Sequence, residues 1–109
     1  MKLIHHFSPL PPSVTVSRSK IHGLGLIALD DIEAGVDLGI SHVLNDNYKD
    51  GLIRTPLGGF INHSANANCL LENDGKNLKL VTQKQIDKDE ELTVDYHGWY
   101  DDDAISKLK

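Results

Sequence analysis

The segment Gly58-Gly59-Phe60-Ile61-Asn62-His63-Ser64 is the most distinctive stretch of this 109-residue chain. Two glycines lead into an apolar Phe-Ile pair, and a dense polar cluster follows, continuing to Asn68 and Cys69. Adjacent asparagine and histidine side chains supply directional donors and acceptors that can read the edge of a purine. The segment therefore predicts a binding site carried by a loop.

Two other readings of this segment, and one of the stretch 45–51, are weaker. Asn62-His63-Ser64 is a glycosylation sequon, but the first residues, Met1 to His6, lack the long apolar stretch of a signal peptide, so glycosylation is not expected. A zinc site using His63, Cys69 and His97 would lack paired C-x-x-C or H-x-x-x-H spacing, so no metal site is predicted. The stretch 45–51 resembles a calcium loop only loosely, because Lys49 occupies a ligand position and no glutamate closes the loop.

A glycine-containing turn lies upstream, at His22-Gly23-Leu24-Gly25-Leu26-Ile27-Ala28. It matches the G-x-G-x-x-G/A dinucleotide pattern formally, but Asp30-Asp31 and Gly35 interrupt the helix that would have to follow. The chain is also too short for a six-stranded sheet with crossover helices. Glycines here still allow a backbone to lie flat against a ligand. A simple β-turn without a ligand is the alternative interpretation.

A third motif lies downstream, at Asp89-Glu90-Glu91-Leu92-Thr93-Val94-Asp95-Tyr96, followed by His97-Gly98-Trp99-Tyr100. An isolated alternating strand that ends in tyrosine usually places the ring in the core. By itself this motif does not decide a function.

Composition describes a single globular domain. The chain is 39% hydrophobic and 25% charged, with a net charge of −5, which argues against a nucleic-acid backbone as the main partner. No apolar run reaches the roughly 20 residues needed to cross a bilayer, so no membrane partner is predicted. The single cysteine, Cys69, allows no internal disulfide, which favours a reducing intracellular compartment, cytoplasmic or nuclear.

Local patterns predict a mostly-β domain of many short strands without an internal repeat. A terminal helix is the only helix expected, at residues 101–109. Between the strands, an Asn73-Asp74-Gly75 turn indicates a hairpin. The expected strands are 14–16, 26–29, 36–40, 70–72, 78–81 and 92–96.

Taken in order, the motifs resemble the SET-domain family from about Val14 to Tyr100, so residues 1–109 are identified as a single SET domain. The resemblance implies a β-clip of several short twisted sheets with a C-terminal pseudoknot. The run 53–59 resembles small stand-alone SET proteins of viruses and bacteria. The matching blocks are Lys20-Ile21-His22-Gly23-Leu24-Gly25, Gly59-Phe60-Ile61-Asn62-His63-Ser64 with Asn68-Cys69, and Glu91-Leu92-Thr93-Val94-Asp95-Tyr96.

The resemblance implies an S-adenosylmethionine-dependent protein-lysine N-methyltransferase that releases S-adenosylhomocysteine. Its partner would be a lysine-containing protein or peptide. A homodimer is also compatible with the resemblance. Tyr96 would be the catalytic residue, while Val94 and Trp99 would border the lysine channel. The alternative is a catalytically silent SET module that binds cofactor or peptide without turnover. The implied cofactor-binding residues are His22, Gly23, Leu24, Gly25, Asn62, His63 and Tyr96.

Two features depart from the family pattern. Larger SET enzymes carry cysteine-rich flanks that bind zinc, and a chain with one cysteine cannot. Trp99, Tyr100 and the tail are then the local candidates for closing the lysine channel. A tyrosine often found between the first two motifs falls near His42, with Tyr48 a few residues later.

Overall fold

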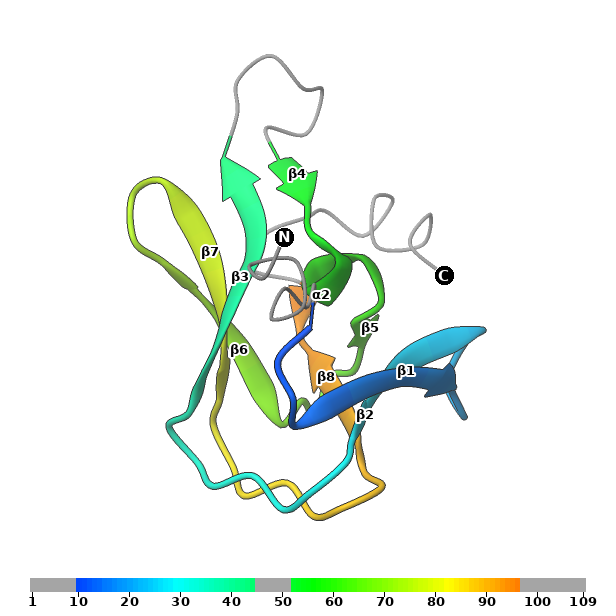
Figure 1. The fold of residues 1–109 in the computed structure, drawn as a ribbon. Helices are drawn as coiled ribbons and strands as arrows, with labels where there is room; N and C mark the ends of the chain where they lie inside the picture. The colour runs from blue at the N-terminus through cyan, green and yellow to red at the C-terminus, as the bar shows by residue number, and fades with distance from the viewer. Residues whose placement is uncertain (1–9, 45–51, 97–109) are drawn as a thin grey trace, which may run out of the picture.

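The computed structural model describes residues 10–44 and 52–96 and builds them into two four-stranded sheets (Figure 1). The strand orders are β1-β2-β8-β5 and β4-β3-β7-β6. The prediction of a mostly-β fold of small sheets is confirmed. Within these residues, no helix has the length and apolar character needed to cross a membrane. The elements are β1 (Val14–Arg18), β2 (Leu24–Ala28), β3 (Asp37–Leu44), β4 (Leu52–Arg54), α2 (Pro56–Gly59), β5 (Asn62–His63), β6 (Cys69–Asn73), β7 (Asn77–Thr82) and β8 (Glu91–Val94).

The hairpin predicted around Asn73-Asp74-Gly75 forms as β6 and β7, and Leu70 pairs with Val81. Its turn is held by the Asp74 carboxylate, which accepts the backbone N–H groups of Lys76 (3.0 Å) and Asn77 (2.8 Å). These two bonds lower the pKa of Asp74. The predicted turn at 45–51 and the helix at 101–109 lie outside the described residues.

An internal repeat, which the sequence did not reveal, joins the two sheets. The connections β2–β3 and β7–β8 lie side by side (Figure 1), and Ile32 and Ile86 exchange backbone bonds of 2.7 and 2.8 Å between them. Further bonds repeat with the same offset of 54 positions (28 to 82, 32 to 86, 35 to 89), so the repeat is one of backbone arrangement, whereas the expectation of no repeat concerned the sequence. The matching bonds are Ala28 N to Glu90 O and Asp89 N to Ala28 O in one unit, and Thr82 N to Val36 O and Gly35 N to Thr82 O in the other.

The core is built on the same repeat. Each unit contributes three apolar side chains at matching positions, and burying each contributes about 1.5–3 kcal/mol. The pairs are Leu26 with Leu80, Ile32 with Ile86, and Leu38 with Leu92, all buried.

Strand β8 departs from the alternating pattern predicted for it. Leu92, Thr93 and Val94 are all buried, because the strand is flanked by β2 and β5 and also contacts β6. Its partner β5 runs parallel to it, pairing Asn62 with Thr93 and His63 with Val94. This pairing brings the second and third motifs together, while the threading of a pseudoknot stays a prediction.

Candidate functional site

A small cavity of about 50 Å³ lies where β4, α2, β5 and the end of β8 meet. Three of the predicted site residues line it, namely Asn62, His63 and Tyr96. They come from two motifs about 30 positions apart that only the β5–β8 pairing brings together. The remaining lining residues are Arg54, Gly58, Gly59 and Ile61.

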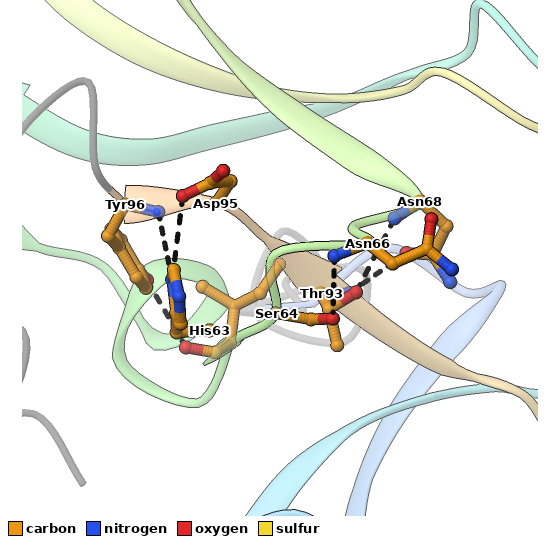
Figure 2. Close-up of polar contacts among 8 residues, drawn as sticks. His63, Ser64, Asn66, Asn68, Thr93, Asp95 and Tyr96 are labelled. Atoms are coloured by element: carbon orange, nitrogen blue, oxygen red, sulfur yellow. Dashed lines mark hydrogen bonds and ion pairs between the residues drawn. The ribbon is translucent and has the colours of Figure 1, made fainter.

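Tyr96 is held in this cavity by three contacts to the β5 segment (Figure 2). Its hydroxyl donates to the Ile61 carbonyl at 3.2 Å, and its backbone N–H donates to His63 Nδ1 at 3.1 Å. The His63 and Tyr96 rings stack with centroids 6.2 Å apart. With only 3% of its surface exposed, Tyr96 is fixed in one orientation.

The Nδ1 atom of His63 faces the backbone of Tyr96 and the carboxylate of Asp95. Because Nδ1 accepts the Tyr96 N–H, that nitrogen carries no proton in this arrangement. Asp95 Oδ1 lies 3.8 Å from the same nitrogen, too far for a hydrogen bond. The His63 ring therefore orients the backbone of Tyr96.

Asn62 connects the cavity to the glycine turn. Its amide Nδ2 donates to the carbonyl oxygens of His22 and Leu24, each at 3.1 Å. Gly23, between them, has a φ of 51° and open space where a side chain would project. Gly25 is buried, and a β-carbon there would overlap the Glu91 carboxylate. The predicted cofactor-binding residues of the turn are thus brought next to the Asn-His pair.

The two predicted channel residues are less clearly placed. Val94 is fully buried in the core and is not among the residues that line the cavity. Because β8 ends at Val94, strand alternation does not extend to Tyr96. Trp99, like Tyr48, lies outside the described residues. His42 is buried on β3, where its Nδ1 lies 2.9 Å from the Ser41 hydroxyl, so it packs behind α2.

Sequence reasoning missed four residues of this region. Arg54 and Gly59 line the cavity and belong to stretches that the sequence analysis quoted, but neither was assigned a role in the site. Ser19 and Glu91 contact each other and Asn62, although they are 72 positions apart. Only the three-dimensional contacts identify them, because the four come from β4, α2, the glycine turn and β8.

The residues fit one end of S-adenosylmethionine. The exposed turn has open space beside Gly23, and the cavity offers polar side chains and room for a small group. A cavity of about 50 Å³ cannot enclose a nucleoside, so that part would lie on the exposed surface. Among residues 10–44 and 52–96, no group of three or more metal-ligating side chains is found, and burial raises the pKa of the Cys69 thiol to about 12.

Comparison with known proteins identifies the family. The SET-domain model matches residues 39–97, more than half of the chain, and the protein belongs to the SET-domain family. A search of curated protein sequences finds no match.

Solved structures resemble the fold at low sequence identity. A crystal structure of a proposed histone methyltransferase from Plasmodium falciparum is 20% identical with a TM-score of 0.65, covering 77% of this chain and 92% of that one. The SET domain of the tumour suppressor RIZ1 (PRDM2) is 19% identical with a TM-score of 0.66. The match covers 95% of this chain and 80% of that one. An inhibitor-bound humanized mutant of Polycomb Repressive Complex 2 from Chaetomium thermophilum is 20% identical with a TM-score of 0.66. The match covers 84% of this chain and 16% of the chain in that structure. These likenesses establish the fold.

Proposed function

We propose that this protein is an S-adenosylmethionine-dependent protein-lysine N-methyltransferase. The observation that carries the proposal is that the Asn62-His63 pair and Tyr96 line one small cavity in a SET-domain chain, and that Asn62 also contacts the glycine turn. Solved structures with the same fold include proteins described as histone methyltransferases, which supports the proposed reaction class.

When bound, S-adenosylmethionine supplies a methyl group on a positively charged sulfonium. The turn from His22 to Gly25 and the Asn62-His63 pair would hold it. In the reaction, the lysine N–CH₃ bond forms as the S–CH₃ bond breaks, S-adenosylhomocysteine leaves, and the amine proton passes to water. Because only a neutral amine can attack, the positive charge of the bound sulfonium would favour loss of the lysine proton.

Tyr96 would orient the acceptor amine. Its hydroxyl proton is directed to the Ile61 carbonyl, and a phenolic oxygen can also accept a hydrogen bond from an amine. The stacked His63 ring and the bond from the Tyr96 N–H hold that oxygen in place. Much of the rate should come from this positioning, because the attack must be in line with the S–CH₃ bond.

The number of methyl groups added is a further part of the proposal. Val94 does not line the cavity. If the lysine route extends to it, this residue, which is smaller than an aromatic one and has no hydroxyl to hold a water, would let the amine turn with methyl groups attached. We therefore propose that di- or trimethyllysine can form.

The test is methyl transfer by the purified protein from labelled S-adenosylmethionine to a host lysate, followed by sequencing of modified peptides. We expect label on lysine, and at least about tenfold slower transfer by Tyr96→Phe with cofactor affinity retained. Label on another residue type would contradict the proposal. Cofactor binding by calorimetry without transfer to any protein would instead support the catalytically silent module.

A further inference from the structure

We propose that Ser19, Glu91 and Asn62 form a latch that fixes the glycine turn in its cofactor-binding conformation. Ser19 and Glu91 are then positioning residues, which act on the cofactor through the turn. The inference rests on the proposed function for the identity of the cofactor. The latch itself can be tested without any ligand.

The first part of the latch is the Ser19 hydroxyl, which ties the start of the turn to β8. It donates to the Glu91 carboxylate, with oxygens at 2.8 and 2.9 Å. It also accepts the backbone N–H groups of Ile21 at 2.8 Å and His22 at 3.1 Å. A backbone bond from Ser19 N to Gly23 O at 2.8 Å closes the turn. One side chain therefore connects the carboxylate to the backbone of the turn.

The second part is the close approach of Glu91 to Gly25. The half-buried carboxylate lies where a β-carbon on residue 25 would sit, and Asn62 Nδ2 would lie 3.1 Å from that carbon. Only glycine allows this approach without displacing the carboxylate. Gly25 is required here because it leaves room for Glu91.

The third part is the Asn62 amide, whose two hydrogens face four acceptors. These are Ser19 Oγ, the His22 and Leu24 carbonyl oxygens at 3.1 Å, and Glu91 Oε2 at 2.8 Å. All four neighbours of Nδ2 accept hydrogen bonds, which fixes the orientation of the amide and turns its oxygen away from the latch. Asn62 thus holds both sides of the turn against β5, next to Tyr96 and the cavity.

The location of Ser19 and Glu91 distinguishes a role in positioning the turn from a role in stabilising the whole fold. Ser19 and Glu91 are half-buried and their side chains lie outside the apolar core, so weakening the latch should release the turn and leave the sheets intact. The effect should appear in cofactor affinity and not in acceptor affinity. Carboxylate hydrogen bonds are among the stronger ones in proteins, so the loss should be large enough to measure.

The experiment uses Glu91→Gln, with Glu72→Gln on the exposed face of β6 as the control for the same loss of charge. We expect the KM for S-adenosylmethionine to rise by about tenfold or more in Glu91→Gln, while the KM for the acceptor peptide stays within about threefold. Glu72→Gln should match the wild type. Ser19→Ala, at a turn position outside the core, serves as the second latch variant if Glu91→Gln folds poorly.

Two further measurements make the proposal falsifiable. Without cofactor, the amides of Ile21 and His22 should exchange hydrogen faster in Glu91→Gln than in the wild type. Gly25→Ala should weaken cofactor binding in the wild type but add little in Glu91→Gln, because both act through one contact. Unchanged exchange or additive effects would overturn the latch. If the wild type binds no S-adenosylmethionine while Glu91→Gln still accelerates exchange, the proposed function fails and the cofactor role of the latch with it.

Discussion

The adjacent glycines of α2 should respond in opposite ways to the same substitution. Gly58 is buried, and a β-carbon there would overlap the Ser41 carbonyl and lie 3.0 Å from His42 Cε1. That carbonyl also accepts the Thr55 N–H at 2.9 Å and the Thr55 hydroxyl at 3.0 Å. Gly59 is exposed, lines the cavity, and has no atom within 4 Å of the corresponding position.

The structure gives the size of each effect. Gly58→Ala must move a backbone carbonyl with two hydrogen bonds, so it should lower the free energy of unfolding by about 2 kcal/mol or more. For a domain of this size that corresponds to a fall in Tm of about 8–16 °C. Gly59→Ala meets no obstacle and reduces the freedom of the unfolded chain, so it should change stability by between zero and about 1 kcal/mol in the favourable direction.

Urea and thermal unfolding followed by circular dichroism measure the stability of both variants. Calorimetry with S-adenosylmethionine then tests the cavity, because the methyl group of Gly59→Ala projects into space that borders it. We expect a stable Gly59→Ala protein with weakened cofactor affinity. Equal stability of the two variants would refute the packing argument, and unchanged affinity in Gly59→Ala would remove this cavity from the cofactor site.

Four other predictions follow from single residues. Asp89 has a φ of 72°, at the position matching Gly35 (φ 83°), so Asp89→Gly should raise the free energy of unfolding by up to about 1 kcal/mol in urea titrations. The folded state lowers the pKa of Asp74 below its ordinary value of 3.8, so the stabilisation lost in Asp74→Asn should be largest at neutral pH and disappear only as pH falls through that lowered pKa, seen by unfolding at several pH values. Cys69 is buried with a pKa of about 12, so Ellman's reagent should modify it only after unfolding. Val94→Phe should lower the free energy of unfolding by about 1–3 kcal/mol because Val94 is fully buried. Mass spectrometry should then compare the number of methyl groups that the variant and the wild type add. If that number is the same, Val94 does not line the lysine route.

Local signals in the sequence predicted the elements that local physics determines. The β6–β7 hairpin follows from a turn sequence between two apolar runs, and β1 and β2 follow from short β-branched or apolar stretches. Strands β4 and β5 and helix α2 were missed, because two to four residues are too few to show a period. The repeat was missed because the matching apolar positions are few and the loops between them differ in sequence.

The candidate site was predicted in part. Resemblance to a family located Asn62, His63 and Tyr96, and the structure brings these residues together. It did not reveal that Asn62 and His63 contact the turn and the Tyr96 backbone, because these contacts depend on the parallel pairing of β5 and β8. Arg54 and Glu91 could not be recognised as neighbours of the site, since charged residues are common and only contacts distinguish these two.

The short pairing of β5 with β8 has a consequence for the order in which the protein folds. It consists of two residues on each side, and the chain between them must first form the β6–β7 hairpin and the connection to β8. Closing such a distant contact costs chain entropy that two residue pairs barely offset, so it should form late on the folding pathway. The residues of the candidate site should therefore come together last and separate first on heating, and a bound ligand would slow their separation more than it slows melting of the sheets.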